Sequence, residues 1–280
     1  MIAIQVYLNG NSYIYNMKIT AILTLFCLIG AYAQDTFISN VKVTYNVIRT
    51  TNNTTQELNA SLLFNSSNSV FSYKTVSVNK PVSQSQEDQL NDYKLNVNVV
   101  HRDTLENHIY NEKGQNTVIK TALDFNSNQR VYIRDTIERL EWKISSESKY
   151  IQSFECIKAT LKYQGSSYTA WFTTEIPTSF GPYDFGQLLG LILELYSEDH
   201  RLYIAATQIT YPFEETVDLP KEDLEYISFS EYEDLNQKYL DSFAKSIKEK
   251  AVRVLTKSER GVKISNIKIE TKKNNKNRKD

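Results

Sequence analysis

The chain has 280 residues and a formal net charge of −1, a balance that excludes the strongly basic surface of a dedicated nucleic-acid-binding protein. Aromatic residues make up 12%, including 19 tyrosines, whereas glycine occurs 8 times and proline 5 times. This composition suits pleated, half-buried strands, and the length allows one large domain with its own core.

An export signal is predicted over residues 17–33. Lys18 is followed by the apolar run Ile19–Ile29, which has the length of a signal-peptide core and is too short to span a bilayer. The small-residue pattern ending at Ala33 predicts cleavage after that residue. We therefore expect residues 1–16 to be an upstream extension and the mature chain to lie in the periplasm, at the outer membrane or outside the cell, without a transmembrane helix.

Strands are predicted wherever apolar residues recur at every second position. Such runs extend over Val41–Val47, Leu95–Val99, Ile119–Phe125, Leu140–Ile144 and Ile157–Tyr163. Polar turn segments separate them, and the apolar runs before and after the turn at Ser197–His200 read as a hairpin. Because no helical pattern intervenes, we expect a mainly β (α+β) fold with one large curved antiparallel sheet or half-barrel.

One helix is predicted near the C-terminus. Ser230 and Glu233 have the spacing of a capping box, and an apolar face follows at helical spacing: Leu235, Tyr239, Leu240, Phe243, Ile247 and Ala251. We expect this helix to pack on the sheet, with a partner-binding helix as the alternative. A single domain is predicted over residues 34–271, followed by a basic polar tail over 272–280 that is either solubilising or in contact with anionic lipid headgroups.

The segment Phe180–Leu193 is too apolar for an exposed loop. It either plugs an open end of the sheet as part of the core or forms the wall of an apolar ligand cleft. The residues that we expect to contact a ligand or partner are Trp171, Phe180, Phe185, Leu188 and Leu191.

Motifs that carry catalysis are missing from the sequence. The three histidines, His101, His108 and His200, do not share a metal-ligand spacing, and neither a GxSxG turn nor a Gly-rich phosphate loop occurs. Only Cys156 lies outside the predicted leader, so no internal disulfide is expected. We therefore predict no catalytic residue, metal or cofactor.

Several short motifs follow one another between Trp142 and Leu193: Trp142 itself, Cys156–Thr160, Ala170–Pro177, Gly181–Phe185 and Gly190–Leu193. In order and spacing they resemble the GLPGLI family of exported proteins from Bacteroidetes-group bacteria. The resemblance implies export to the envelope and a β-rich fold, and it does not indicate a mechanism. In the naming motif, Gln187 stands where the family has Gly and Leu189 where it has Pro, so the local turn is expected to differ.

These observations favour a non-catalytic exported envelope protein that binds an apolar ligand or an outer-membrane partner, either a protein or lipid, through the Phe180–Leu193 segment. A structural or assembly protein without a small ligand is the first alternative. A hydrolase whose active site is assembled from residues distant in sequence is the second.

Overall fold

The computed structural model describes residues 2–8, 11–17, 35–51, 54–74 and 106–257. The predicted cleavage site after Ala33, the predicted strand at Leu95–Val99 and the basic tail 272–280 lie outside these residues. Two strands precede the main body and pair with each other, β1 (Ile2–Leu8) and β2 (Asn11–Met17).

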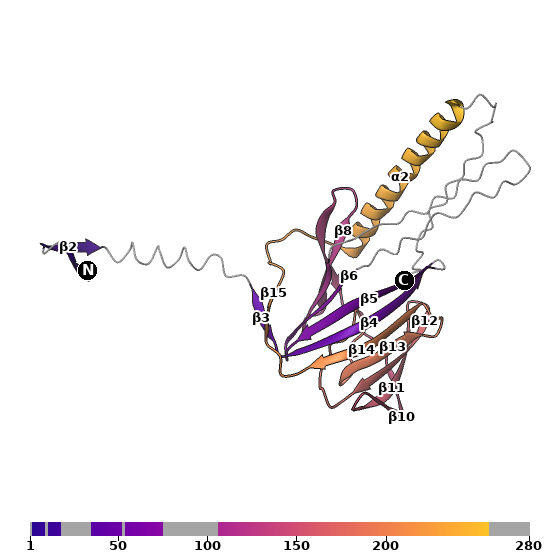
Figure 1. The fold of residues 1–280 in the computed structure, drawn as a ribbon, viewed down its shortest axis with the longest axis horizontal. Coiled ribbons are helices and arrows are strands. Elements are labelled where there is room, and N and C mark those ends of the chain that lie inside the picture. The colour runs from indigo at the N-terminus through magenta and orange to yellow at the C-terminus, as the bar shows by residue number, and fades with distance from the viewer. Residues whose placement is uncertain (1, 9–10, 18–34, 52–53, 75–105, 258–280) are drawn as a thin grey trace, which may run out of the picture.

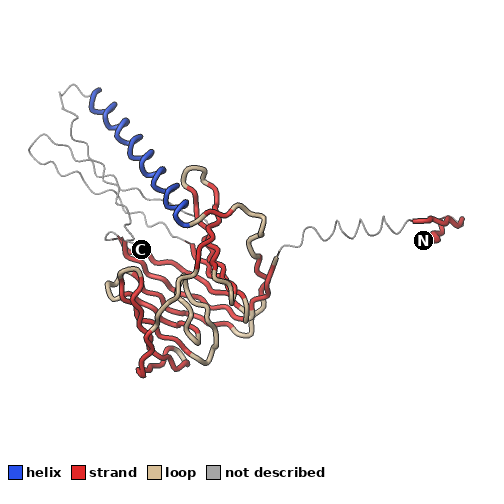
Figure 2. The backbone as a smooth tube through the Cα atoms, turned by 180° about the vertical axis from the view of Figure 1, so that it is seen from behind, coloured by secondary structure: helices blue, strands red, loops and turns tan. Residues whose placement is uncertain are grey.

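A single twelve-stranded sheet dominates the molecule, with the order β10-β11-β12-β13-β14-β4-β5-β6-β7-β8-β9-β16. Figures 1 and 2 show its strands running through the whole body. The strands are β4 (Val41–Thr51), β5 (Thr54–Phe64), β6 (Asn68–Lys74), β7 (Glu106–Glu112), β8 (Thr117–Asp124), β9 (Gln129–Thr136), β10 (Lys143–Ile151), β11 (Phe154–Tyr163), β12 (Ser166–Thr173), β13 (Leu191–Ser197), β14 (Leu202–Thr210) and β16 (Tyr226–Ile227). The mainly β fold with one large sheet is thus confirmed.

The sheet differs from the expectation in one respect, because it is mixed. The short strand β16 pairs with β9 in parallel, whereas the other neighbours in the described sheet run antiparallel. In the chain, β16 follows β9 only after the strands β10 to β15. A tight hairpin, which would make the pair antiparallel, therefore does not connect β9 and β16.

Register shifts are concentrated in one half of the sheet, between Ile144 and Ser148, Trp171 and Phe172, and Ala206 and Gln208. Bulges of this kind bend a strand and increase the local twist. They help the β10–β14 end to curve round until it faces the β7–β9 end.

The main core lies along the strands that the alternation predicted. Val43, Tyr45 and Val47 of β4 are fully buried, and the Tyr45 hydroxyl donates to the Ile192 carbonyl at 2.9 Å. A smaller core joins the paired strands β3 (Thr36–Ser39) and β15 (Glu215–Asp218) to the large sheet. Phe37 and Val217 of this pair pack with Leu63 of β5 and Val70 of β6.

Between β12 and β13 the chain crosses the inside of the curved sheet as a segment without helix or strand, residues 174–190, which we call the crossing segment. Its aromatic rings reach strands from both halves: Phe180 lies 6.5 Å from Phe64, Tyr183 4.7 Å from Phe71 and Phe185 4.8 Å from Tyr168. The crossing segment therefore fills the interior of the sheet.

Close backbone contact fixes the crossing segment at its glycines. A Cβ at Gly190 would lie 2.0 Å from the Thr173 carbonyl oxygen, and one at Gly181 would lie 1.9 Å from the Phe185 carbonyl oxygen. No real Cβ tolerates such distances, so both positions require glycine.

The predicted strand over Leu140–Ile144 begins only at Lys143, and residues 137–142 form an extended link instead. The cause is tertiary: Trp142 Nε1 donates to the Gly186 carbonyl at 2.8 Å, and the Leu140 N–H donates to Gln187 Oε1 at 3.0 Å. These groups bind the crossing segment rather than a neighbouring strand.

The helix α2 (Phe229–Lys257) follows β16 and extends away from the sheet (Figures 1 and 2). Its first turns pack on the β8–β9 hairpin, where the Tyr232 hydroxyl donates to the Leu123 carbonyl at 3.3 Å and the Tyr239 ring lies 5.7 Å from Phe125. Packing of the helix on the sheet is confirmed for this part. No helix in the described ranges is long and apolar enough to cross a membrane.

The capping box was predicted two residues too late. The Ser228 hydroxyl accepts from the Glu231 N–H at 3.2 Å, and the Glu231 carboxylate accepts from the Ser228 N–H at 2.7 Å. The sequence offers the same spacing at Ser230 and Glu233, but pairing of Tyr226–Ile227 with β9 keeps the chain extended up to Ser228. Ser228 is therefore the first residue that can cap the helix.

Candidate ligand-binding cleft

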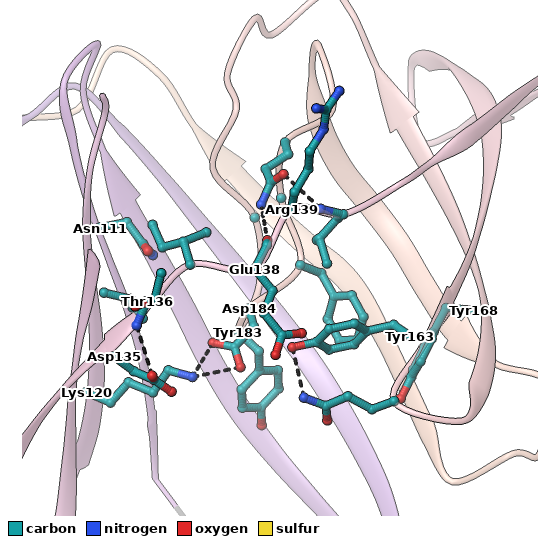
Figure 3. Close-up of a pocket in the computed structure, with 18 of the residues that line it drawn as sticks. Asn111, Lys120, Asp135, Thr136, Glu138, Arg139, Tyr163, Tyr168, Tyr183 and Asp184 are labelled. Atoms are coloured by element: carbon teal, nitrogen blue, oxygen red, sulfur yellow. Dashed lines mark hydrogen bonds and ion pairs between the residues drawn. The ribbon is translucent and has the colours of Figure 1, made fainter. Parts of the chain in front are cut away.

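The curvature of the sheet leaves an open cleft of about 1310 Å³ between its two ends. One wall comes from β7–β9, including Asn111, Lys120 and Asp135. The opposite wall comes from the ends of β11–β14, including Tyr163, Tyr168 and Arg201. The crossing segment forms the floor with Phe180 and Tyr183–Gln187, so residues far apart in sequence meet in one hollow (Figure 3).

Aromatic side chains cover part of this hollow. Tyr163 and Tyr168 flank Phe185, with ring centroids 6.1 and 4.8 Å from it. Both tyrosines are half-buried, whereas Phe185 is buried. The packing fixes the two tyrosine rings at the cleft surface, each with an apolar body and a polar tip.

An ion pair joins the floor to one wall. Lys120 Nζ on β8 lies 2.6 Å from Asp184 Oδ1 on the crossing segment, as the dashed lines in Figure 3 show. Both side chains are partly exposed, so the pair adds little to stability. Its effect is to hold a donor and an acceptor in fixed positions at the cleft surface.

A second polar cluster holds the rim together at the β11–β12 and β13–β14 turns. Arg201 Nε donates to Asp199 Oδ2 at 2.7 Å, and the Ser166 hydroxyl donates to the same oxygen at 3.2 Å. Hydrogen bonds from Arg201 and Ser197 hold the pKa of the Asp199 carboxyl well below its usual range. The Asp199 carboxylate is therefore charged at neutral pH.

Acidic groups surround Tyr163. Burial, the negative charges of Asp184 and Glu138, and a hydrogen bond to Glu138 all raise the pKa of the Tyr163 hydroxyl. Figure 3 places Tyr163 close to both Glu138 and Asp184. Tyr163 is thus a neutral hydroxyl at physiological pH, between two carboxylates that can accept hydrogen bonds from a ligand.

Gln187 clamps the link 137–142 to the floor. Its Nε2 donates to the Glu138 carbonyl at 2.8 Å, and its Oε1 accepts from the Leu140 N–H at 3.0 Å. The residue adopts a positive φ of 64°, a conformation that favours glycine. The turn at the position where the resemblance placed glycine is thus formed here by glutamine, whose side chain supplies two hydrogen bonds.

The family model described as "N-glycanase peptide, N-terminal domain" matches residues 83–238, more than half of the chain. The chain belongs to this N-glycanase N-terminal-domain family. Two solved structures of PNGF-II, in the C2 and P21 space groups, are similar at 18% identity over 72% of the chain, with TM-scores of 0.44 and 0.43. The chain spans about a third of their length, 32% and 33%. No curated protein matches it.

Two of the five residues predicted to contact a ligand, Phe180 and Phe185, line the cleft. Trp171 is 9% exposed and packs under Lys149, whose Nζ lies 4.4 Å from the centre of the ring. Leu191 is fully buried in the core. Leu188 is buried beneath a second, smaller hollow of about 380 Å³. Ligand or partner contact by the five residues stays a prediction, as does the GLPGLI resemblance.

The polar half of the cleft is not recognisable in the sequence. Lys120 and Asp184 are 64 positions apart, and Ser166 and Arg201 are 35 positions apart, so no spacing pattern could have joined them. The hairpin turns that hold Ser166 and Asp199 were recognisable as turns, but only the curvature of the sheet brings them to one rim.

Among the described residues, His108, His200 and Cys156 do not line the cleft. His200 lies in the β13–β14 turn between Asp199 and Arg201, and His101 lies outside the described residues. His108 Nδ1 lies 2.8 Å from the Ser72 hydroxyl, and burial lowers the pKa of the imidazole. Cys156 is fully buried, and burial raises the pKa of its thiol to about 11. Within the described ranges, no group of three or more His, Cys, Asp or Glu residues is placed to hold a metal ion.

Proposed function

We propose that this chain is a non-catalytic, exported carbohydrate-binding domain whose cleft holds the glycan of a glycoprotein. The observation that carries the proposal is the cleft itself, in which tyrosine rings and fixed ion pairs share one open surface. Membership in a family named for an N-glycanase, an enzyme that by its name acts on N-glycans, supports the glycan as ligand.

The chemistry of the cleft suits a sugar ring. One face of a pyranose carries C–H groups that pack on an aromatic ring, and its edge carries hydroxyls that both donate and accept. Tyr163 and Tyr168 offer the apolar faces. The Lys120–Asp184 pair and Asp199 offer charged donors and acceptors, which form the stronger hydrogen bonds, and they are already held in place before a ligand arrives.

The size and openness of the cleft favour a chain of sugars over a small metabolite. Its volume of about 1310 Å³ exceeds the roughly 300–1,000 Å³ that is usual for small-molecule pockets. A branched oligosaccharide on a protein needs an open site of this kind because the rest of the glycoprotein remains outside.

Isothermal titration calorimetry with a biantennary N-glycopeptide tests the proposal. Tyr168→Ala removes one tyrosine face and should weaken binding about tenfold. Tyr150→Ala is the matched control, because Tyr150 lies on β10, is 73% exposed and does not line the cleft. A glycopeptide that does not bind the wild-type chain, or that binds both variants equally, would refute a glycan site here.

A second candidate function is contact with an outer-membrane protein, favoured by a pair of exposed apolar side chains. Leu189 on the crossing segment is 78% exposed and Ile144 on β10 is 55% exposed, and both border the smaller hollow. A Leu189→Ser, Ile144→Ser double variant should lose co-purification with envelope protein and keep glycopeptide binding. Unchanged co-purification would remove this candidate.

Export underlies both candidates and can be tested separately. We expect mature protein in the envelope fraction to begin at Gln34, as N-terminal sequencing would show. Unprocessed chain in the cytosol would contradict the predicted leader.

A further inference from the structure

The charge of the cleft deepens the proposed function and rests on it, because it indicates which glycans fit. Among the described residues that line the cleft, four are basic and six are acidic: Lys113, Lys120, Arg139 and Arg201 against Glu112, Asp135, Glu138, Asp184, Asp199 and Glu233. An anionic ligand therefore enters a site that already has an excess of negative charge.

The four basic side chains are poorly placed to bind an acidic sugar. Lys120 is paired with Asp184, and Arg201 is paired with Asp199. Lys113 lies on the exposed turn after β7, and Figure 3 shows the Arg139 guanidinium pointing away from Tyr163 and Asp184. An acidic sugar would have to compete with a protein carboxylate for either paired cation.

The negative charge is concentrated at the aromatic part of the cleft. Figure 3 places Glu138 and Asp184 close to Tyr163, a ring on which a sugar would pack. A sialic acid carboxylate or a sulfate bound at this ring would meet the charge of Glu138 and a Lys120–Asp184 pair whose cation already contacts a carboxylate. In a partly desolvated hollow the repulsion is stronger than in bulk water.

We propose that the cleft selects neutral glycans and discriminates against acidic ones, such as sialylated or sulfated chains. Neutral sugar hydroxyls can donate to Glu138, Asp184 and Asp199, so the same carboxylates that repel an anion hold a neutral sugar. The discrimination should be at least about tenfold in affinity at low salt and should shrink as salt screens the charges.

The test uses one biantennary N-glycopeptide in two forms, sialylated and treated with sialidase, titrated calorimetrically into the full chain at about 50 mM and about 500 mM salt. We expect the sialidase-treated form to bind at least about tenfold more tightly at low salt, with a smaller ratio at high salt. Equal affinities, or tighter binding of the sialylated form, overturn the inference and leave the proposed glycan site standing. If neither form binds, the proposed function itself fails.

Charge-removing variants locate the discrimination. Asp184→Asn frees Lys120 from its carboxylate partner. It should reduce the ratio of the affinities for the sialidase-treated and sialylated glycopeptides several-fold, as should Glu138→Gln. The matched control is Glu147→Gln, since Glu147 is paired with Lys158 at 2.9 Å away from the described cleft lining. A ratio that is unchanged in both cleft variants, or that narrows equally in the control, overturns the assignment to the cleft. Circular dichroism confirms that each variant is folded.

Discussion

Two effects of Gln187 on stability oppose each other: its side-chain hydrogen bonds stabilise the fold, and its positive φ destabilises it. Replacement by alanine removes the hydrogen bonds to the Glu138 carbonyl and the Leu140 N–H and keeps the positive φ. Replacement by glycine removes the same hydrogen bonds and also relieves the backbone. Because the two substitutions differ mainly in the conformational term, the comparison separates the clamp from the strain.

The magnitudes follow from the geometry. Two hydrogen bonds at about 0.5–1.5 kcal/mol each predict a loss of about 2 kcal/mol in the free energy of unfolding for Gln187→Ala. The left-handed conformation costs a residue with a Cβ about 1–2 kcal/mol. Glycine avoids this cost, but it loses more conformational entropy on folding, which offsets part of the gain. Gln187→Gly should therefore be more stable than Gln187→Ala by roughly 0.5–1 kcal/mol.

Equilibrium urea denaturation followed by tryptophan fluorescence measures both values, since the chain has 2 tryptophans and Trp142 lies beside the clamp. Gln152 is the matched control: it has a φ of 54° and donates a single hydrogen bond, to the Ala206 carbonyl at 3.0 Å, so Gln152→Ala should lose about half as much. If Gln187→Gly is less stable than Gln187→Ala, the strain argument is wrong. If neither differs from wild type, Gln187 is not a clamp.

Three further predictions concern buried groups. Leu188→Asp should lower the unfolding free energy by about 3 kcal/mol or more because it buries an unpaired carboxylate. Leu189→Asp, at a 78% exposed position, should change the unfolding free energy by less than about 0.5 kcal/mol. Equal effects of the two substitutions in urea denaturation would contradict the burial assigned to this turn. Burial lowers the pKa of His108, so its contribution to stability is complete above the unfolded pKa of about 6.5 and is lost as pH falls below it. His108→Gln should accordingly flatten the fall of the unfolding free energy between about pH 7 and 5, because it removes a group that binds protons more readily in the unfolded chain. Identical pH profiles for the two proteins would refute this. Cys156, with its pKa raised to about 11, should react with iodoacetamide at pH 8 about a hundredfold more slowly in the folded chain than in urea; mass spectrometry showing rapid labelling of the folded chain would contradict its burial.

Local patterns in the sequence predicted the parts of the fold that local physics decides. Alternation identified Val43, Tyr45 and Val47 as a buried face, and they are fully buried. The turn at Ser197–His200 gave the hairpin of β13 and β14. The period-two pattern alone identified the buried face of β4. The turn identified the hairpin because the residues that pair there lie close in sequence.

The errors occurred where distant contacts override a local pattern. Leu140 and Trp142 alternate like strand residues, but they bind the crossing segment. Ser230 has a capping-box partner, yet β16 keeps the chain extended only as far as Ile227, and Ser228 caps the helix instead. Both outcomes depend on where the sheet places its neighbours, which spacing along the chain does not encode.

The candidate site divides in the same way. Its aromatic floor, with Phe180 and Phe185, was visible as part of the apolar segment Phe180–Leu193. Its polar half was not, because Lys120 and Asp184 are ordinary surface residues until the curved sheet brings them within 2.6 Å.

The two ends of the long sheet are protected by different means. At one end, β16 covers the outer hydrogen-bonding groups of β9 along Tyr132 and Ile133. At the other end, the outer side of β10 has no neighbour in the described sheet, but the strand is interrupted by an irregularity between Ile144 and Ser148 and carries Lys143, Glu147 and Lys149. Charges and a distorted backbone at an open edge discourage the addition of a foreign strand, so β10 is a poor template for edge-to-edge aggregation.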